Sequence, residues 1–254
     1  IDAKQLLSIT GSASYIQSGG LFILRGRFQR TPSAFTAISN LSDVSLATLN
    51  TSRILNGINS SYGSFNLENL NNIFRVAGGT IRIYDVTGTG AGEQEAFDVK
   101  SSSSNINVTG GTLEIIPVTG TVLADAANYR INTTAPLYNL SINRLSSSSV
   151  AGLSAALTLQ NNLILTSGSL VANNFNLTVG GNVNIENGTA YTPGTNTTVL
   201  NGNADQTFTI NLASALSLYG LNINKPAGVS LNIAGSQGTL NITNSFNLTL
   251  GTLN

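Results

Sequence analysis

The strongest constraint on the fold is a phrase that the sequence contains twice. Residues 137–144 read LYNLSINR, and residues 218–225, 81 positions later, read LYGLNINK. Each copy leads into a second matching stretch, LTLQNNLILTSGSL at 157–170 and LNITNSFNLTLGTL at 240–253, with apolar residues, Asn and Gly in equivalent slots. Self-similarity on this scale is typical of stacked structural units, so the sequence predicts a repeat protein.

The spacing between the two copies is too long for a single coil of a solenoid. We interpret it as a superunit of three to four coils that includes a variable loop. This interpretation predicts that Leu163 and Phe246 take equivalent inward positions and that Tyr138 and Tyr219 take equivalent corners. We interpret both tyrosines as packing or ladder residues rather than as sugar-binding platforms.

Short runs in which apolar residues alternate with Asn, Thr or Ser occur along most of the chain. Alternation with a period of two indicates strands that bury one face and leave the other in water. Helix-like patterns are confined to residues 124–129 and 212–218, each sufficient for a turn or two. The clearest predicted strands are 21–24, 80–84, 105–109, 112–116, 157–159, 163–166, 176–179, 182–185, 207–210, 221–224, 230–233, 239–243 and 245–250.

Three phrases in the first half place paired glycines between two strands. They are YIQSGGLFI at 15–23, FRVAGGTIRI at 74–83 and INVTGGTLEI at 106–115. Paired glycines allow a sharp corner because they adopt positive φ without a Cβ clash. An antiparallel sandwich would instead use hairpin dipeptides and would not repeat. We therefore expect an all-β, right-handed parallel β-helix, as one solenoid domain over residues 1–254.

Four segments interrupt the pattern: 26–60, 85–100, 123–129 and 145–156. We expect them to be lateral loops that leave the solenoid, and residues 26–60 are long enough to carry a loop subdomain. Because the repeated part is scaffold, a specific activity would be expected in these unrepeated loops. The chain lacks Met and ends within a repeat, so we expect it to be a fragment of a longer repetitive protein.

The composition excludes several classes of function. Only 9% of the residues are charged, and 11 basic residues balance 11 acidic ones, so no long-range field favours nucleic acid or an anionic membrane. The absence of Cys and His excludes disulfides and thiol catalysis and removes the commonest general base and metal ligand. No apolar run reaches the roughly 18–20 residues that span a bilayer, so no membrane insertion of this segment is expected.

The densest charged cluster lies in the loop DVTGTGAGEQEAFDVK. Asp85, Glu93, Glu95 and Asp98 are its candidate oxygen ligands for Ca²⁺. Two of these carboxylates could also act as the pair needed for glycoside hydrolysis. Their spacing matches no known Ca²⁺ loop, and nothing positions an acid against a base. We favour a solvated loop, with neither a cofactor nor catalysis.

The only basic cluster is LRGRFQR, with Arg25, Arg27 and Arg30. It could contact an acidic polysaccharide or phosphate, but arginines that close one end of a coil are the favoured interpretation. Polysaccharide lyases on β-helices need a basic residue beside acidic ligands on one coil face, and the sequence offers no such set. We therefore expect that the chain is not an enzyme.

Asparagine recurs at matching places in the second half. These residues could form a sugar-binding surface, but Asn also tolerates left-handed corners and stacks in amide ladders along a solenoid. We favour the structural interpretation. The recurrent positions are Asn161, Asn173, Asn174, Asn182, Asn222, Asn232 and Asn244.

A run of short motifs gives the second half a recognisable order. GGN at 180–182, NGT at 187–189 and PGT at 193–195 are followed by NG, QT and then LYGLNINK. In this order they resemble the repeats of large secreted surface proteins of Bacteroidota, including gliding-motility adhesins exported by the type IX secretion system. The likeness is best over residues 137–254. It implies an extracellular or cell-surface location and a partner in the secretion machinery, with surface glycans or other cell-surface components as further partners.

These observations lead to an expected function. We expect a structural or adhesive extracellular surface protein, in which a stiff β-solenoid stalk or filament segment displays binding regions. The alternative is a carbohydrate-binding or polysaccharide-processing β-helix of a secreted enzyme.

Overall fold

The computed structural model confirms the expected all-β parallel β-solenoid. Every regular element among the described residues is a β-strand, except for one turn of 3-10 helix at Ser103–Asn105. The chain divides into two compact units, unit 1 at Ile1–Ala135 and unit 2 at Pro136–Asn254, and each is described by itself. The expectation of one domain over the whole chain stays a prediction. The structure describes residues 6–9, 15–17, 27–30, 37–40, 65–67, 70–83, 94–116, 129–144, 150–236 and 239–254.

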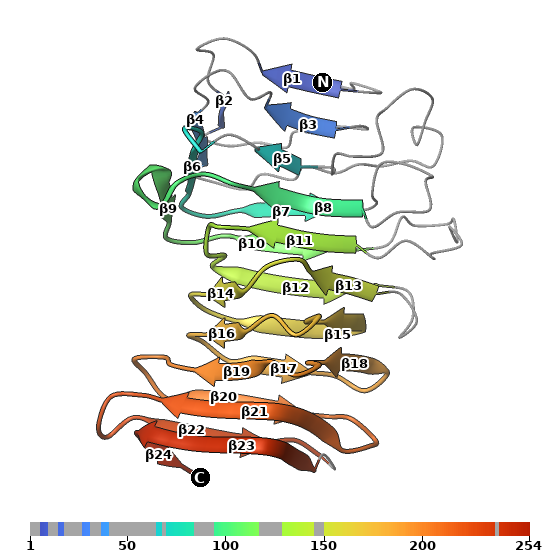
Figure 1. Cartoon of the computed structure of the whole chain (residues 1–254), viewed down its shortest axis with the longest axis vertical. Coiled ribbons are helices and arrows are strands. Elements are labelled where there is room, and N and C mark those ends of the chain that lie inside the picture. Colours follow the sequence, from blue (N-terminus) through green and yellow to red (C-terminus); the bar gives the residue numbers. More distant parts are fainter. Residues whose placement is uncertain are drawn as a thin grey trace. The chain divides into compact units, whose positions relative to one another are not determined.

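Unit 1 stacks its strands in three parallel ladders (Figure 1). Each ladder takes one strand from successive turns of the chain, which is the pairing of a parallel β-helix. The first ladder joins β1 (Leu6–Ile9), β3 (Arg27–Arg30), β5 (Phe65–Leu67), β8 (Gln94–Val99) and β11 (Tyr129–Thr133). The second joins β2 (Tyr15–Gln17), β4 (Ala37–Asn40), β6 (Ile73–Val76) and β9 (Ile106–Val108), and the third joins β7 (Thr80–Ile83) and β10 (Thr112–Ile115).

Paired glycines form two of the corners of unit 1. The chain turns from β6 into β7 at Gly78 and Gly79, and from β9 into β10 at Gly110 and Gly111. The second glycine of each pair has positive φ, 73° at Gly79 and 90° at Gly111, which a residue with a Cβ rarely adopts. Two of the three predicted glycine corners are therefore confirmed. The glycines of the third, at 19–20, lie outside the described residues.

Phenylalanine fills the core of unit 1. Phe28, Phe65 and Phe97 lie in register on consecutive strands and stack with ring centroids 5.1 Å apart at each step. Phe74 meets the rings of Phe65 and Phe97 edge-on at 6.1 and 6.0 Å. All four side chains are at most 1% exposed, so this aromatic column belongs to the core of unit 1.

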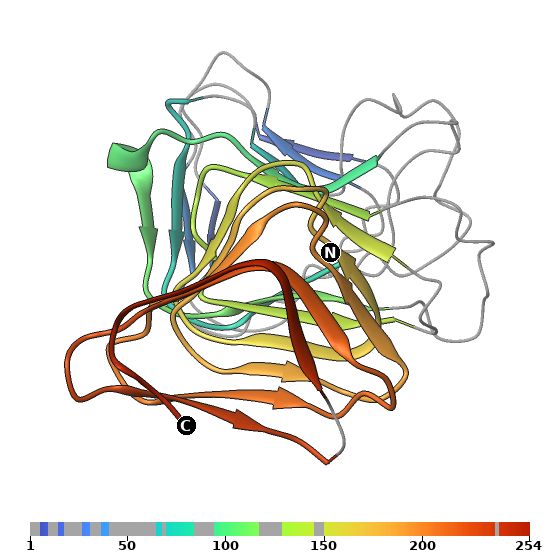
Figure 2. The same cartoon turned by 60° about the horizontal axis from the view of Figure 1, so that its bottom comes forward.

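Unit 2 also has three parallel ladders, and Figure 2 shows its coils, from yellow to red, with the bottom of the view forward. The first joins β14 (Leu157–Leu159), β16 (Leu177–Val179), β19 (Thr197–Leu200), β21 (Leu216–Asn224) and β23 (Leu240–Leu250). The second joins β12 (Asn139–Asn143), β15 (Leu163–Val171), β17 (Val183–Ile185), β20 (Gln206–Ile210), β22 (Ser230–Ala234) and β24 (Thr252–Leu253). The third joins β13 (Val150–Leu153), the second half of β15 and β18 (Thr189–Thr192).

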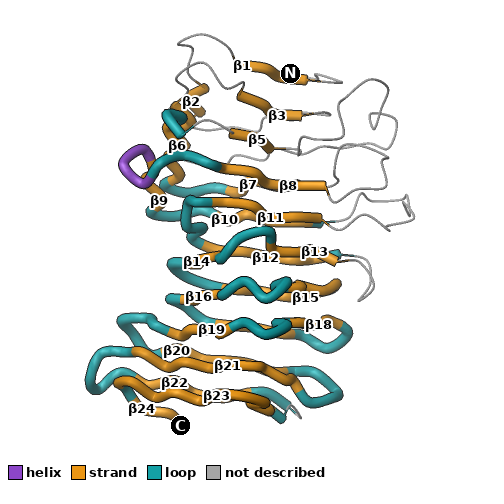
Figure 3. Tube along the Cα trace, in the orientation of Figure 1, coloured by secondary structure: helices purple, strands orange, loops and turns teal. Residues whose placement is uncertain are grey.

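Aliphatic columns fill the core of unit 2. Leu163, Val183 and Phe208 pair in register along the second ladder, and all three are buried. Leu165 pairs with Ile185 beside them, and both have no exposed surface. Along each strand, buried residues alternate with more exposed ones, as the sequence pattern predicts. Figure 3 shows the strands of successive coils in orange, one beside the next.

The two copies of the repeated phrase do not occupy equivalent positions. Leu140 of the first copy lies in β12 of the second ladder, whereas Leu221 of the second copy lies in β21 of the first ladder. Leu163 and Phe246 are likewise on different sheets. Phe246 pairs in register with buried Leu221, so it continues an inward column, and it is 50% exposed because β23 is the last strand of its ladder. The predicted register is therefore wrong.

Coil length explains this error. Register partners in adjacent coils of unit 2 lie 19–26 residues apart. Three coils from Leu140 lead through the ladder to Phe208, 68 residues on, and a fourth leads to Ile233, 93 residues on. A spacing of 81 residues falls between these values, so the second copy lands on another face of the coil. Tyr138 accordingly lies in a bend and Tyr219 within a strand.

The segments expected to be lateral loops each contain part of a ladder. Residues 26–60 include β3 and β4, 85–100 include β8, 123–129 end at the first residue of β11, and 145–156 include β13. The rest of 26–60, residues 85–93, 123–128 and 145–149 lie outside the described residues. Residues 212–218, considered for a helical turn, form a bend that leads into β21.

Candidate functional site

Of the four acidic candidates for Ca²⁺, the structure describes the side chain of Asp98. Asp85 and Glu93 lie outside the described residues, and of Glu95 only the backbone, paired with Arg130, is described. Asp98 is 1% exposed, so it does not belong to a solvated loop. Within the described parts of the chain, no group of three or more acidic side chains is placed to hold a metal ion.

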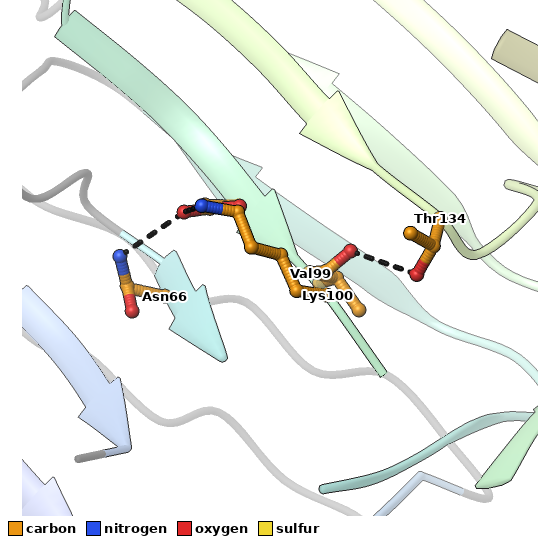
Figure 4. A network of polar contacts seen from close by, with 5 residues as sticks. Asn66, Val99, Lys100 and Thr134 are labelled. Atoms are coloured by element: carbon orange, nitrogen blue, oxygen red, sulfur yellow. Dashed lines mark hydrogen bonds and ion pairs between the residues drawn. The ribbon is translucent and has the colours of Figure 1, made fainter. Parts of the chain in front are cut away.

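Asp98 instead belongs to a polar network in the first ladder of unit 1 (Figure 4). Its Oδ2 lies 3.2 Å from Nζ of Lys100 and 3.5 Å from Nδ2 of Asn66, which faces it in the neighbouring coil. On the next coil, the hydroxyl of Thr134 donates to the carbonyl oxygens of Val99 and Ser101 at 3.2 and 2.6 Å. The contact of Asp98 with Asn66 and those of Thr134 with Val99 and Ser101 join consecutive coils, which gives Asp98 a structural role.

Of the arginine cluster, the structure describes the backbone of two residues but none of the three side chains. Arg27 and Arg30 are the first and last residues of β3, paired with Leu6 and Ile9 of β1, and Arg25 lies outside the described residues. The structure therefore places two of the three arginines at the ends of one ladder strand. Whether they close a coil stays a prediction.

Asparagine side chains connect the coils of unit 2. The Nδ2 group of Asn161 donates to Oδ1 of Asn139 at 2.9 Å. The backbone N–H of Asn182 donates to Oδ1 of Asn162, and that of Thr207 donates to Oδ1 of Asn182, both at 2.8 Å. Asn161 and Asn182 thus have the structural role that was expected, because each bond crosses from one coil to the next.

The two asparagines at 173 and 174 form a left-handed corner. Their φ values are 52° and 68°, in the region that Asn tolerates better than other residues with a Cβ. Oδ1 of Asn174 then accepts the backbone N–H of Thr195, at 2.8 Å, from the next coil. The expected use of Asn at corners is therefore confirmed at these positions.

Each copy of the repeated phrase ends in a buried cation, which the sequence did not single out as a feature. Arg144 is 3% exposed and Lys225 is 1% exposed. Nζ of Lys225 donates to the carbonyl oxygens of Gly202 and Ala204 at 3.2 and 3.0 Å. Burial lowers the pKa of Lys225, and nearby Asp205 offsets part of that shift. Through these two hydrogen bonds, Lys225 holds its own coil to the preceding one.

A cleft of about 390 Å³ opens in unit 2 between two consecutive coils. One wall is β18 with the turn at Pro193 and Gly194, and the other is formed by residues 212–219. The third ladder breaks here, because β18 pairs with β15 but with no later strand among the described residues. Residues 213–214 form a bend instead, so the two coils separate.

The cleft is lined without charge. Its hydroxyl groups come from threonine, serine and tyrosine, including Thr192, Ser217 and Tyr219. Tyr191 lines it as well, and its hydroxyl is held inside the coil by Thr198 and Asn196, both at 3.1 Å. Burial raises the pKa of Tyr191 in spite of these two hydrogen bonds, so its phenol stays neutral. No sequence motif indicated this cleft.

The fold defines the chain as a parallel β-solenoid, and comparisons with known proteins go no further. No protein-family model matches the chain, and neither the curated proteins nor the solved structures contain a significant match. Among the described residues no helix is long and apolar enough to cross a membrane.

Proposed function

We propose that the chain is a structural or adhesive segment of an extracellular surface protein. It acts as a stiff β-solenoid stalk or filament piece that holds binding regions away from the cell. The observation that carries the proposal is the continuity of the parallel ladders together with the side chains that bond each coil to the next. Such a stack resists bending because each coil is hydrogen-bonded to its neighbours through at least two ladders.

The composition agrees with display in water. Only 9% of the residues are charged, and exposed Asn, Thr and Ser provide the polarity, so the surface is hydrated without attracting polyanions. The motif order GGN, NGT and PGT resembles that of Bacteroidota surface proteins, and supports export by type IX secretion and a location at the cell surface. Neither a cofactor nor an enzymatic activity is part of this proposal.

Labelling intact cells of the native source with an antibody against the chain tests this proposal. We expect surface labelling, and we expect deletion of the segment from its gene to weaken attachment of the cells to glycan-coated or cell-coated surfaces. Labelling confined to permeabilised cells, or attachment unchanged by the deletion, would overturn the proposal.

The enzymatic alternative has its own test. The purified chain is incubated with a panel of acidic polysaccharides and the products are measured as new reducing ends. We expect no turnover. Turnover that disappears when Asp85, Glu93 or Glu95 is changed to the corresponding amide would replace the scaffold proposal with that of a polysaccharide-processing β-helix.

A further inference from the structure

We propose that the cleft between β18 and β21 binds a neutral saccharide, either one or two sugar units or the matching part of a longer neutral glycan. This gives the proposed scaffold a specific ligand site within the repeated coils rather than in the loops. It rests on the proposed function only for the expectation that glycans are within reach at a cell surface.

The first wall of the cleft is β18, and because no following strand among the described residues pairs with it, its outer edge has backbone donors and acceptors. The carbonyl oxygen of Thr192 accepts the N–H of Ala172, so the backbone groups of Thr192 face β15. Because these groups alternate along a strand, the N–H and C=O of Tyr191 face the opposite edge, which borders the cleft. No strand among the described residues pairs with that edge.

The second wall offers the same kind of groups. The N–H of Leu216 donates to the carbonyl oxygen of Thr239 at 2.8 Å, so it faces β23. The alternation then turns the N–H and C=O of Ser217 toward the cleft. Two short stretches of backbone edge, unpaired with any strand among the described residues, thus border one space, and each presents N–H donors and C=O acceptors.

Hydroxyl groups and one aromatic ring complete the lining. Thr192 and Ser217 are exposed and contribute hydroxyls that can both donate and accept hydrogen bonds. Tyr219 is half-buried at the cleft, where its ring offers an apolar face beside a polar hydroxyl. Sugars combine hydroxyl groups with apolar C–H faces, so this lining matches their chemistry.

Charge and size narrow the class of ligand. None of the described residues that line the cleft is Lys, Arg, Asp or Glu, so an anionic sugar would lose water without gaining a countercharge. A volume of about 390 Å³ is near the lower end of the range for small-molecule sites. It accommodates a short saccharide rather than a long stretch of polymer.

An extended peptide fits these edges less well. A peptide strand needs several consecutive backbone hydrogen bonds along a free edge. β18 is followed at once by Pro193, which has no N–H, and the free part of β21 ends at Gly220, whose N–H donates to Asn196 of the preceding coil. Each free edge is therefore only a few residues long, which suits a polyol better than a strand.

The test is a binding measurement on the whole chain by saturation-transfer NMR and titration calorimetry. The probes are maltose, cellobiose, lactose and chitobiose, with digalacturonate and a Thr/Val hexapeptide as the competing classes. We expect saturable binding of at least one neutral disaccharide and none of the other two classes. Absence of binding to all four neutral probes, or a preference for digalacturonate or the peptide, would overturn the proposal.

Variants place the site. Tyr219→Ala is expected to weaken binding at least tenfold, and Thr192→Val, which removes an exposed hydroxyl at nearly constant shape, several-fold. Tyr138→Ala is the matched control, because Tyr138 has the same place in the repeated phrase and does not line the cleft. Circular dichroism checks that each variant folds. If Tyr219→Ala does not fold, the binding measured for Thr192→Val still tests the site. Equal binding by wild type and Thr192→Val would contradict the site, while surface labelling of cells would leave the scaffold proposal standing.

Discussion

Units 1 and 2 build the same kind of coil from different lengths of chain. After its first coil, unit 1 uses 32–37 residues between register partners, whereas unit 2 uses 19–26. The extra residues of unit 1 leave the ladders paired in parallel on both sides of them. Doubling the length of a loop costs only about 0.6 kcal/mol of closure entropy, so coils tolerate insertions at their corners.

The two units also hold their coils together differently. Unit 1 stacks phenylalanine rings on the inside and keeps Asn66 and Asp98 in one column of its ladder. Unit 2 stacks aliphatic side chains and ties its coils with Asn-to-backbone bonds. Long coils thus go with an aromatic core, and short coils with repeated polar contacts at the corners.

The largest expected effect is in the aliphatic core of unit 2. Leu165→Asp places a carboxylate where the wild-type side chain has no exposed surface, and we expect a loss of at least about 4 kcal/mol of unfolding free energy. Urea unfolding followed by circular dichroism measures it, and hydrogen exchange locates it in unit 2. Thr166→Asp, at the exposed neighbouring residue, is the control. An unchanged midpoint for Leu165→Asp would place this strand's alternation on the wrong face.

A somewhat smaller effect is expected from the aromatic column of unit 1. Phe97→Ala removes a ring stacked on Phe65, and we expect a loss of about 3–5 kcal/mol. Phe175→Ala in unit 2 is the control, because that ring is 37% exposed, and its cost should stay below about 1 kcal/mol. The same two measurements apply. Similar losses for both variants would remove the distinction between an aromatic and an aliphatic unit.

The asparagine ties of unit 2 should each contribute less. Asn182→Ala removes the acceptor of the Thr207 N–H, and we expect a loss of about 0.5–1.5 kcal/mol. Hydrogen exchange at Thr207 should quicken in the same variant. Asn203→Ala, in an exposed bend, serves as the control and should have little effect. If exchange at Thr207 stays as slow as in the wild type, the tie does not hold the coils.

The smallest effect concerns pH. Hydrogen bonds from Asn211 and then Asn184 lower the pKa of Glu186 in the folded chain, and burial only partly opposes them. The stabilisation is therefore present above the ordinary value near 4.5 and is lost as pH falls through the lowered value. Urea midpoints measured from pH 6 down to pH 3 should fall more steeply for wild type than for Glu186→Gln. Parallel profiles would exclude this contribution.

The sequence predicted the class of fold because apolar and polar residues alternate clearly in strands that have one solvent-exposed face. It missed strands that are buried on both sides. Residues 96–99 of β8 and 151–153 of β13 are entirely buried, so their sequences, QEAFDV and VAGL, show no alternation and were interpreted as loops. Alternation reports contact with water, and a covered strand gives no such signal.

Register was beyond the sequence for a different reason. The two copies of the repeated phrase are separated by 81 residues of chain. The position of a residue on a solenoid depends instead on how many residues each coil uses, and that number differs between neighbouring coils. The cleft at Tyr219 follows from the same variation, since a strand in one coil meets a bend in the next. Neither property belongs to any single stretch of sequence. The polar partner of Asp98 was hidden in the same way, because Asn66 lies 32 residues away and only coil length brings the two together.

The asparagine ties of unit 2 all point one way. Oxygens of Asn139, Asn162 and Asn182 lie on the earlier coil, and the N–H groups that they accept belong to the later one. The side-chain oxygens of an earlier coil therefore face the segment that follows it and accept N–H groups from that segment. When the chain folds from its amino terminus, these acceptors are in place before the next coil pairs with them, so each completed coil can serve as a template for the one after it.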